Sequence, residues 1–144
     1  MGRRDEGHYS EKHPPGTAVR ETLAAAVRKR AISGEMGCAD AFDIAATLGV
    51  PPREIGAALD LMEIRIAKCQ LGLFGYGSGV KILKKADTVA PELEKAIRDK
   101  LDHGRLSCAA TWEIGAQLDV PRMGVSSACE MLGIKIKPCQ LGAF

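Results

Sequence analysis

Residues 41–60 read AFDIAATLGVPPREIGAALD, and this stretch decides the fold that we expect. Ile44 and Leu48 are four positions apart, the spacing of one helix face, and Gly49 follows them. Pro51-Pro52 comes next, and proline suits the first position of a helix because its missing N–H needs no partner there. The stretch therefore predicts two helices joined by a short turn.

The same pattern returns 70 residues later, where 111–130 read TWEIGAQLDVPRMGVSSACE. Aligning 21–74 with 91–144 without a gap gives 19 identical pairs in 54, more than chance allows for so mixed a composition. The longest shared run is Cys-Gln-Leu-Gly, at 69–72 and 139–142. The chain is therefore expected to hold two copies of one unit. Each copy is close to the lower size limit for independent folding, so we expect the copies to pack together as a pseudo-dimer.

Each copy shows three helical patterns and then an alternation of apolar and basic residues, which is typical of a half-buried strand. The first helices are expected to end at Gly34 and Gly104, and the strands to cover 64–69 and 134–137. In the first copy a glycine-rich run, 75–79, precedes a second strand-like run, 80–85, which predicts a β-hairpin. The fold class that we expect is mainly α with short β-strands, built from two repeated three-helix units.

These patterns set the expected boundaries. Residues 1–16 combine Gly, Pro, His and alternating charge, and are expected to form a disordered tail. Unit 1 is expected over 17–85, including the hairpin. Unit 2 is expected over 86–144 with a truncated hairpin, because the chain stops at Phe144, where the hairpin would turn.

A helix-turn-helix motif needs a small residue where its helices cross, a turn that often contains glycine, and a branched apolar residue in its second helix. The two copies fill these places with Ala45, Gly49 and Ile55 and with Gly115, Asp119 and Val125. With the strands that follow, each half resembles the winged-helix branch of the helix-turn-helix superfamily, common among bacterial and archaeal transcription regulators. The resemblance implies two winged-helix-like units that bind double-stranded DNA. Winged helices also serve as protein-docking modules, so the alternative is a protein-interaction adaptor without DNA binding.

In DNA-binding members of this superfamily, the third helix presents its exposed residues to base edges in the major groove. The residues that this role would use here are Arg53, Arg122, Ser126 and Ser127. Backbone phosphates would be met by cations of the strand regions, where 64–86 contain no acidic residue. Those cations are Arg65, Lys68, Lys81, Lys84, Lys85, Lys135 and Lys137. The competing interpretation is that an alternating strand simply needs soluble side chains on its outer face.

Four cysteines form two repeat-related pairs, Cys38 with Cys69 and Cys108 with Cys139. They could build a thiolate metal site if the fold gathered all four. However, the members of each pair are 31 positions apart, whereas metal sites usually supply close pairs. The alternatives are buried apolar packing where helix and strand meet, or a redox-sensing disulfide within each pair. We expect no metal and no cofactor.

The overall composition narrows the classes of protein further. The formal net charge is only +2, so bulk electrostatics do not demand a nucleic acid or a membrane partner. No apolar run reaches the roughly 18–20 residues of a membrane helix. Five cysteines without an export signal favour the reducing cytoplasm. The histidines are scattered and no nucleophile–base constellation appears, so we do not expect an enzyme.

Overall fold

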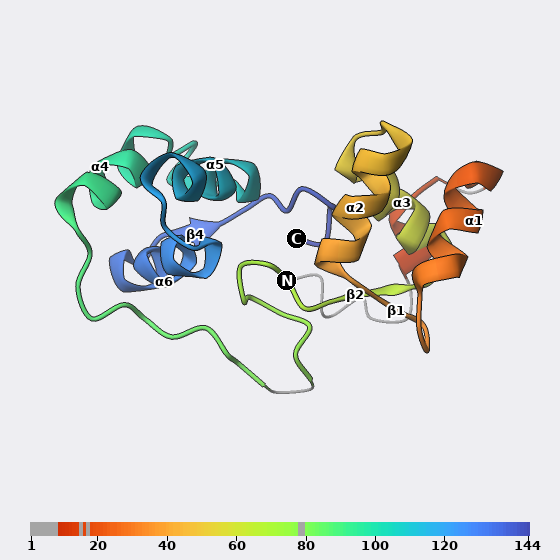
Figure 1. Cartoon of the computed structure of the whole chain (residues 1–144), viewed down its shortest axis with the longest axis horizontal. Coiled ribbons are helices and arrows are strands. Elements are labelled where there is room, and N and C mark those ends of the chain that lie inside the picture. Colours follow the sequence, from red (N-terminus) through yellow and green to blue (C-terminus); the bar gives the residue numbers. More distant parts are fainter. Residues whose placement is uncertain (1–8, 15, 17, 78–79) are drawn as a thin grey trace. The chain divides into compact units, whose positions relative to one another are not determined.

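The structure, a computed structural model, describes residues 9–14, 16, 18–77 and 80–144 and divides into two compact units. Unit 1 comprises the described residues up to Cys69 together with Leu141–Phe144, and unit 2 comprises Gln70–Gln140. Both units are mainly helical with short strands, which confirms the expected fold class at that level (Figure 1). The expected boundary was wrong in one respect, since 70–85 belong to unit 2 and the last four residues belong to unit 1.

The two units share one order of elements, helix–strand–helix–helix–strand (Figure 1). In unit 1 these elements are α1 (Glu21–Arg30), β1 (Glu35–Gly37), α2 (Cys38–Leu48), α3 (Pro52–Leu61) and β2 (Arg65–Ala67), preceded by the short 3-10 helix η2 (Tyr9–Lys12). In unit 2 they are α4 (Pro91–Asp99), β3 (Arg105–Leu106), α5 (Cys108–Leu118), α6 (Arg122–Leu132) and β4 (Lys135–Ile136).

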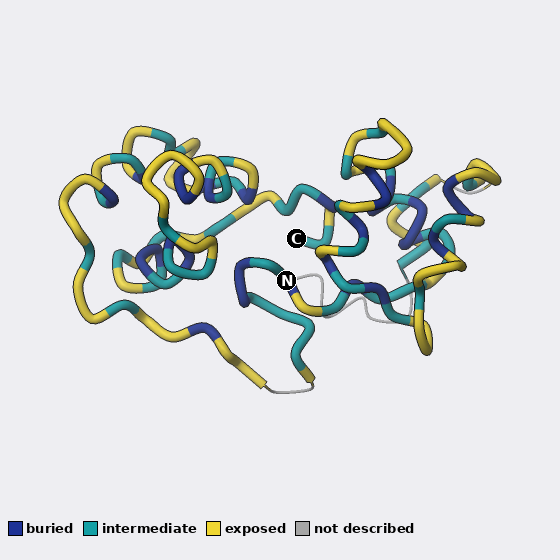
Figure 2. Tube along the Cα trace, in the orientation of Figure 1, coloured by how far each residue is buried: buried dark blue, intermediate teal, exposed yellow. Residues whose placement is uncertain are grey.

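Both cores use the same repeat positions. The core of unit 2 is a cluster of buried side chains, which are Leu93, Ile97, Leu106, Ile114, Val125, Ala128 and Cys129. The residues 70 positions earlier are also buried, and they are Leu23, Val27, Met36, Ile44, Ile55, Ala58 and Leu59 (dark blue in Figure 2). Each unit therefore closes around its own core, with the second and third helices supplying more than half of the side chains.

The turn between the second and third helices depends on one left-handed residue in each unit. Gly49 has φ 66° and donates its N–H back to the carbonyls of Ala45 and Ala46, while Asp119 has φ 55° and donates to Gly115. Asp tolerates this conformation better than most residues with a Cβ. The turn reverses the chain so that α3 packs on α2 in unit 1 and α6 packs on α5 in unit 2.

Gly34 and Gly104 do not end the first helices, as the sequence had suggested. Helix α1 already ends at Arg30, and a tight turn follows in which Ile32 and Glu35 exchange both backbone hydrogen bonds, at 2.9 and 3.0 Å. The two central residues, Ser33 and Gly34, both have positive φ. That pairing is what a two-residue hairpin turn requires. The same turn recurs in unit 2 at 102–105.

The expected hairpin wing is not formed by the described residues. Strand β2 pairs with β1 in parallel, Met36 opposite Ile66, and β4 pairs with β3 in the same way. Val80 and residues 81–85 belong to no helix or strand. Leu83 is buried there, and the N–H of Ala86 donates to the carbonyl of Ser127 on α6. The segment therefore satisfies part of its backbone against a helix, and within 9–14, 16, 18–77 and 80–144 no strands pair into the antiparallel wing that the winged-helix resemblance implied.

Part of the segment 1–16 is packed on α3 rather than forming the disordered tail that its composition predicts. The backbone N–H groups of Tyr9 and Ser10 donate to the carboxylate of Glu63. His13 and Lys12 lie 2.9 and 3.1 Å from the buried carboxylate of Asp60. Residues 1–8 and 15 lie outside the described residues.

The left-handed turn residue gives a direct test of the fold. Gly49 has open space around it, so Gly49→Ala adds no clash and should cost only the left-handed strain, about 1 kcal/mol of unfolding free energy. Gly49→Asp should cost less, because Asp119 adopts the same conformation in unit 2. Urea denaturation of both variants measures the difference. Equal losses for Ala and Asp would show that the turn does not impose a left-handed residue.

Candidate functional site

The third helix of unit 1 is covered on the face that would read DNA. Gly56 lies there, and a Cβ built on it would stand 1.8 Å from the carbonyl oxygen of Leu141. Asp60, one turn further along, is buried beneath Lys12 and His13. Gly56 and Asp60 of α3 are therefore covered by backbone and side chains of unit 1 itself, whereas Ala57 and Leu61 are half-buried.

The third helix of unit 2 is covered in a similar way. Ser126 is fully buried, and its hydroxyl has no hydrogen-bond partner among the described residues. A Cβ on Gly72 would stand 3.1 Å from the Met123 side chain, so the segment after Gln70 runs close to the start of α6. Ser126 cannot reach a base edge from this position. Ser127 is half-buried and its carbonyl is bonded to the N–H of Ala86.

The predicted cations lie in different surroundings. Arg53 is exposed at the first turn of α3, whereas Arg65 is held by Glu35 at 2.7 Å. Lys81 lies 3.8 Å from Glu130, a pairing that the sequence pattern did not suggest. The remaining predicted lysines are exposed, and they are Lys68, Lys84, Lys85, Lys135 and Lys137.

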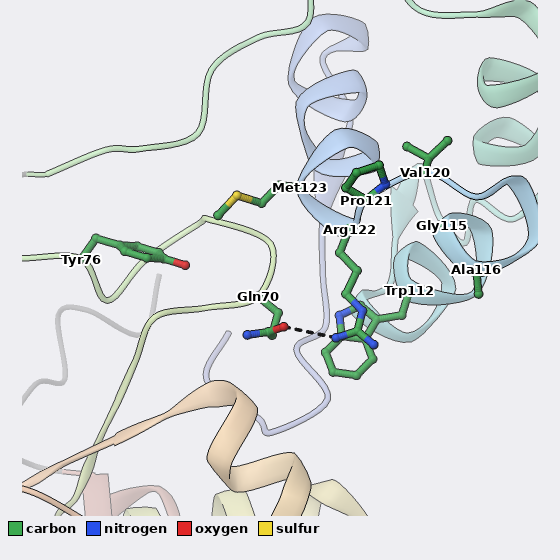
Figure 3. Close-up of a pocket in the computed structure, with 9 residues that line it drawn as sticks. All are labelled: Gln70, Tyr76, Trp112, Gly115, Ala116, Val120, Pro121, Arg122 and Met123. Carbon is green, nitrogen blue, oxygen red and sulfur yellow. Dashed lines mark hydrogen bonds between the residues drawn. The ribbon is translucent and has the colours of Figure 1, made fainter.

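Arg122 occupies an unexpected environment. Its guanidinium lies 3.5 Å from the ring centroid of Trp112, and its Nη1 donates to the Oε1 of Gln70 at 3.2 Å. These side chains line a pocket of about 570 Å³ in unit 2, together with Tyr76 and Met123 among others (Figure 3). The pocket lies where α5, the turn and the start of α6 meet. Sequence reasoning missed it, although Trp112 is the chain's single tryptophan.

Four of the cysteines are buried and Cys139 is half-buried. The N–H of Cys108 donates to the carbonyl of Pro138 at 3.0 Å, which brings Cys108 beside Cys139, and Gln140 donates to the Cys108 sulfur at 3.4 Å. This arrangement matches the interpretation of cysteines packing where helix and strand meet. Within the described residues, no three His, Cys, Asp or Glu side chains form a group that could hold a metal ion. The disulfide hypothesis stays a prediction.

Comparison with protein-family models, with curated proteins and with solved structures finds no match to this chain. Among the described residues, no helix combines the length and hydropathy needed to cross a bilayer. The functional assignment therefore rests on the residues and geometry of the chain itself.

The contact at Gly56 predicts that Gly56→Ala destabilises the full chain but stabilises a chain that lacks the C-terminal residues. Gly56→Ala in the full chain should lower the unfolding free energy by about 2 kcal/mol, because the new methyl group meets the Leu141 carbonyl. In a chain ending at Gln140, the same substitution should raise it by about 1 kcal/mol, since alanine favours helix. Thermal or urea denaturation of the four proteins measures both effects. The same effect in both backgrounds would place the C-terminal residues elsewhere.

Cys129 predicts a pH effect. Burial, aided by the charge of Glu130, raises the pKa of its thiol from 9.0 to about 11. The unfolded chain then loses this proton at lower pH than the folded chain, so the unfolding free energy should fall by about 2 kcal/mol between pH 8 and 11. Cys129→Ala should remove this part of the slope, and Cys139→Ala should retain it. Identical pH slopes for the parent and Cys129→Ala would contradict the prediction.

Proposed function

We propose that the chain binds double-stranded DNA through two helix-turn-helix units, as a transcription regulator does. The observation that carries the proposal is the turn geometry found in both units, a left-handed residue followed by a helix that packs on its predecessor. In helix-turn-helix proteins the N-terminal residues of the second helix of the motif contact base edges. The first turns of α3 and α6 correspond to those residues.

The covered faces limit which residues can take part. Base contacts would come from the first turn of α3, where Arg53 is exposed, and not from Ser126. Arg122 would first have to leave Trp112 and Gln70. Because so few side chains can contact bases, we expect the chain to bind DNA with little preference for one sequence over another.

Phosphate contacts are supported by the exposed lysines of unit 2. Lys84 and Lys85 are exposed, as are Lys135 and Lys137, and none of the four pairs with a carboxylate among the described residues. Cations without countercharges release the ions condensed on DNA when they bind phosphates, so they contribute salt-dependent affinity. The lysines therefore supply positioning, and the first helical turns supply the limited base contacts.

A protein-interaction adaptor is the second candidate, and one observation favours it. Helix α3 is contacted by the residues after Gln140, with the backbone of Leu141 seated directly on Gly56. A helix face that accepts a backbone segment of its own chain has the shape to accept one from a partner. This candidate predicts no affinity for DNA.

Fluorescence anisotropy with a mixed-sequence duplex across a salt series separates the two candidates. The parent chain should bind, with log affinity falling linearly with log salt concentration. Lys84→Ala with Lys85→Ala should reduce that slope by about 2, because each lost phosphate contact contributes about 0.9.

The matched control is Lys95→Ala with Lys100→Ala, which removes the same charge from α4 and the residue that follows it. These lysines are paired with Asp99 at 2.7 Å and Glu113 at 3.1 Å, so the slope should stay close to that of the parent. Equal slopes for the two double variants would remove the specific role of Lys84 and Lys85. The absence of binding at about 50 mM salt would reject DNA binding.

A further inference from the structure

The pocket of unit 2 combines a cation with apolar and aromatic walls. At about 570 Å³ it is within the range of small-molecule sites, roughly 300–1,000 Å³. Tyr76 lies on one side and Trp112 with Arg122 on the other, with Gln70 and Met123 in the space between them (Figure 3). The hydroxyl end of Tyr76 points toward that space. In the DNA-binding proposal Arg122 would have to leave this arrangement, so the pocket as it stands is not explained by DNA binding.

Arg122 is held in place without a carboxylate. Its guanidinium lies over the ring of Trp112, and within the described residues it donates a hydrogen bond to the neutral amide of Gln70. No Asp or Glu of the described residues pairs with it. A guanidinium has five N–H donors in a rigid fork that matches a carboxylate. Most of these donors remain available to a ligand anion.

The first unit shows that the fold does not require this pair. At the positions of Trp112 and Arg122, unit 1 has Phe42 and Pro52. The helices, the left-handed turn and the buried core positions are nevertheless the same. Proline is also well suited to start a helix, so the arginine is not explained by helix formation. The Trp–Arg pair is therefore a property of unit 2 that its architecture leaves unexplained.

We propose that this pocket binds a small aromatic carboxylate. The carboxylate pairs with the free edge of the Arg122 guanidinium and replaces the amide of Gln70. The ring of the ligand lies beside Met123, whose thioether favours an aromatic neighbour, in the space toward which the hydroxyl end of Tyr76 points. The stacked Trp112 keeps the guanidinium oriented before the ligand arrives, which lowers the entropic cost of binding. This site does not rest on DNA binding.

In the first test, benzoate is titrated into the uniformly ¹⁵N-labelled full chain without DNA. NMR detects the binding. The single tryptophan gives one indole N–H signal, so its shift reports on this pocket alone. We expect a saturable shift with a dissociation constant of about 1 mM, which corresponds to about −4 kcal/mol. Benzamide, which lacks the charge, and inorganic phosphate, which lacks the ring, should each bind at least about tenfold more weakly. Cyclohexanecarboxylate should also bind more weakly, because its ring is not aromatic.

Arg122→Gln should weaken benzoate binding at least about tenfold, since it removes the charged fork. Arg53→Gln is the matched control, an arginine lost from the same helical turn in unit 1, and it should leave binding unchanged. Trp112→Phe introduces the residue of unit 1 and keeps an aromatic ring, so it should weaken binding less than Arg122→Gln. This variant has no indole N–H, so its binding is measured from the NMR signals of the arginine guanidinium groups. Circular dichroism melting confirms that each variant is folded.

Several results would overturn the proposal. These are no saturable shift up to about 10 mM benzoate, equal binding of benzoate and phosphate, or equal affinities of the Arg122→Gln and Arg53→Gln variants. Any of these results would mean that Trp112 and Arg122 only stabilise the position of the segment that carries Gln70 and do not bind a ligand. Equal binding of benzoate and cyclohexanecarboxylate would overturn the aromatic part. DNA binding is measured separately by anisotropy, so the failure of either proposal leaves the other standing.

Discussion

The left-handed residue that ends the second helix of each unit is the constraint on which the rest depends. With Gly49 or Asp119 in this conformation, the chain reverses within a few residues, and the next N–H, of Val50 or Val120, bonds back at 3.0 or 2.9 Å. The third helix then starts close to the second, so that Ile55 or Val125 reaches the core. In an extended conformation at this point, those side chains would lose their buried positions, and the pocket of unit 2 would lose its wall at the turn.

Close packing on both sides of the third helix follows from that turn. One face carries the core residues, and beside it lie small buried residues, Gly56 in unit 1, where the backbone of Leu141 approaches, and Ser126 in unit 2. Arg53 and Arg122 in the first turns are exposed, and past the first turn most residues of each helix are buried or half-buried. The proposed base contacts and the pocket therefore both lie at that end of the motif, and a protein that used the whole helix to read DNA would need a different covering.

Local patterns in the sequence were enough to predict the second and third helices of each unit and the turn between them, because each depends on residues a few positions apart; the ends of the first helices were predicted too late in the chain. It was harder to predict which segments of the chain pair with one another. The alternation over 80–85 specified an extended chain but not what it would pair with, so a hairpin was expected where a segment bonded to α6 is found. The parallel pairing of β1 with β2 joins residues about 30 positions apart, and no local pattern encodes it. Ser126 was misjudged because serine is usually exposed, yet a small residue at the same place in both copies was the available signal.

The duplicated architecture separates what the fold requires from what a function could require. Positions that must be buried or small keep that character in both copies, as Ala58 and Ala128 do in the cores. Positions that differ without changing the fold are free to carry specificity, and Pro52 against Arg122 is the clearest of these. Unit 2 has the Trp–Arg pair and most of the exposed lysines considered for phosphate contact, whereas Arg65 of unit 1 is neutralised by Glu35. The two units therefore share one fold but differ in the charged and aromatic side chains that they expose, and both proposals draw mainly on the side chains of unit 2.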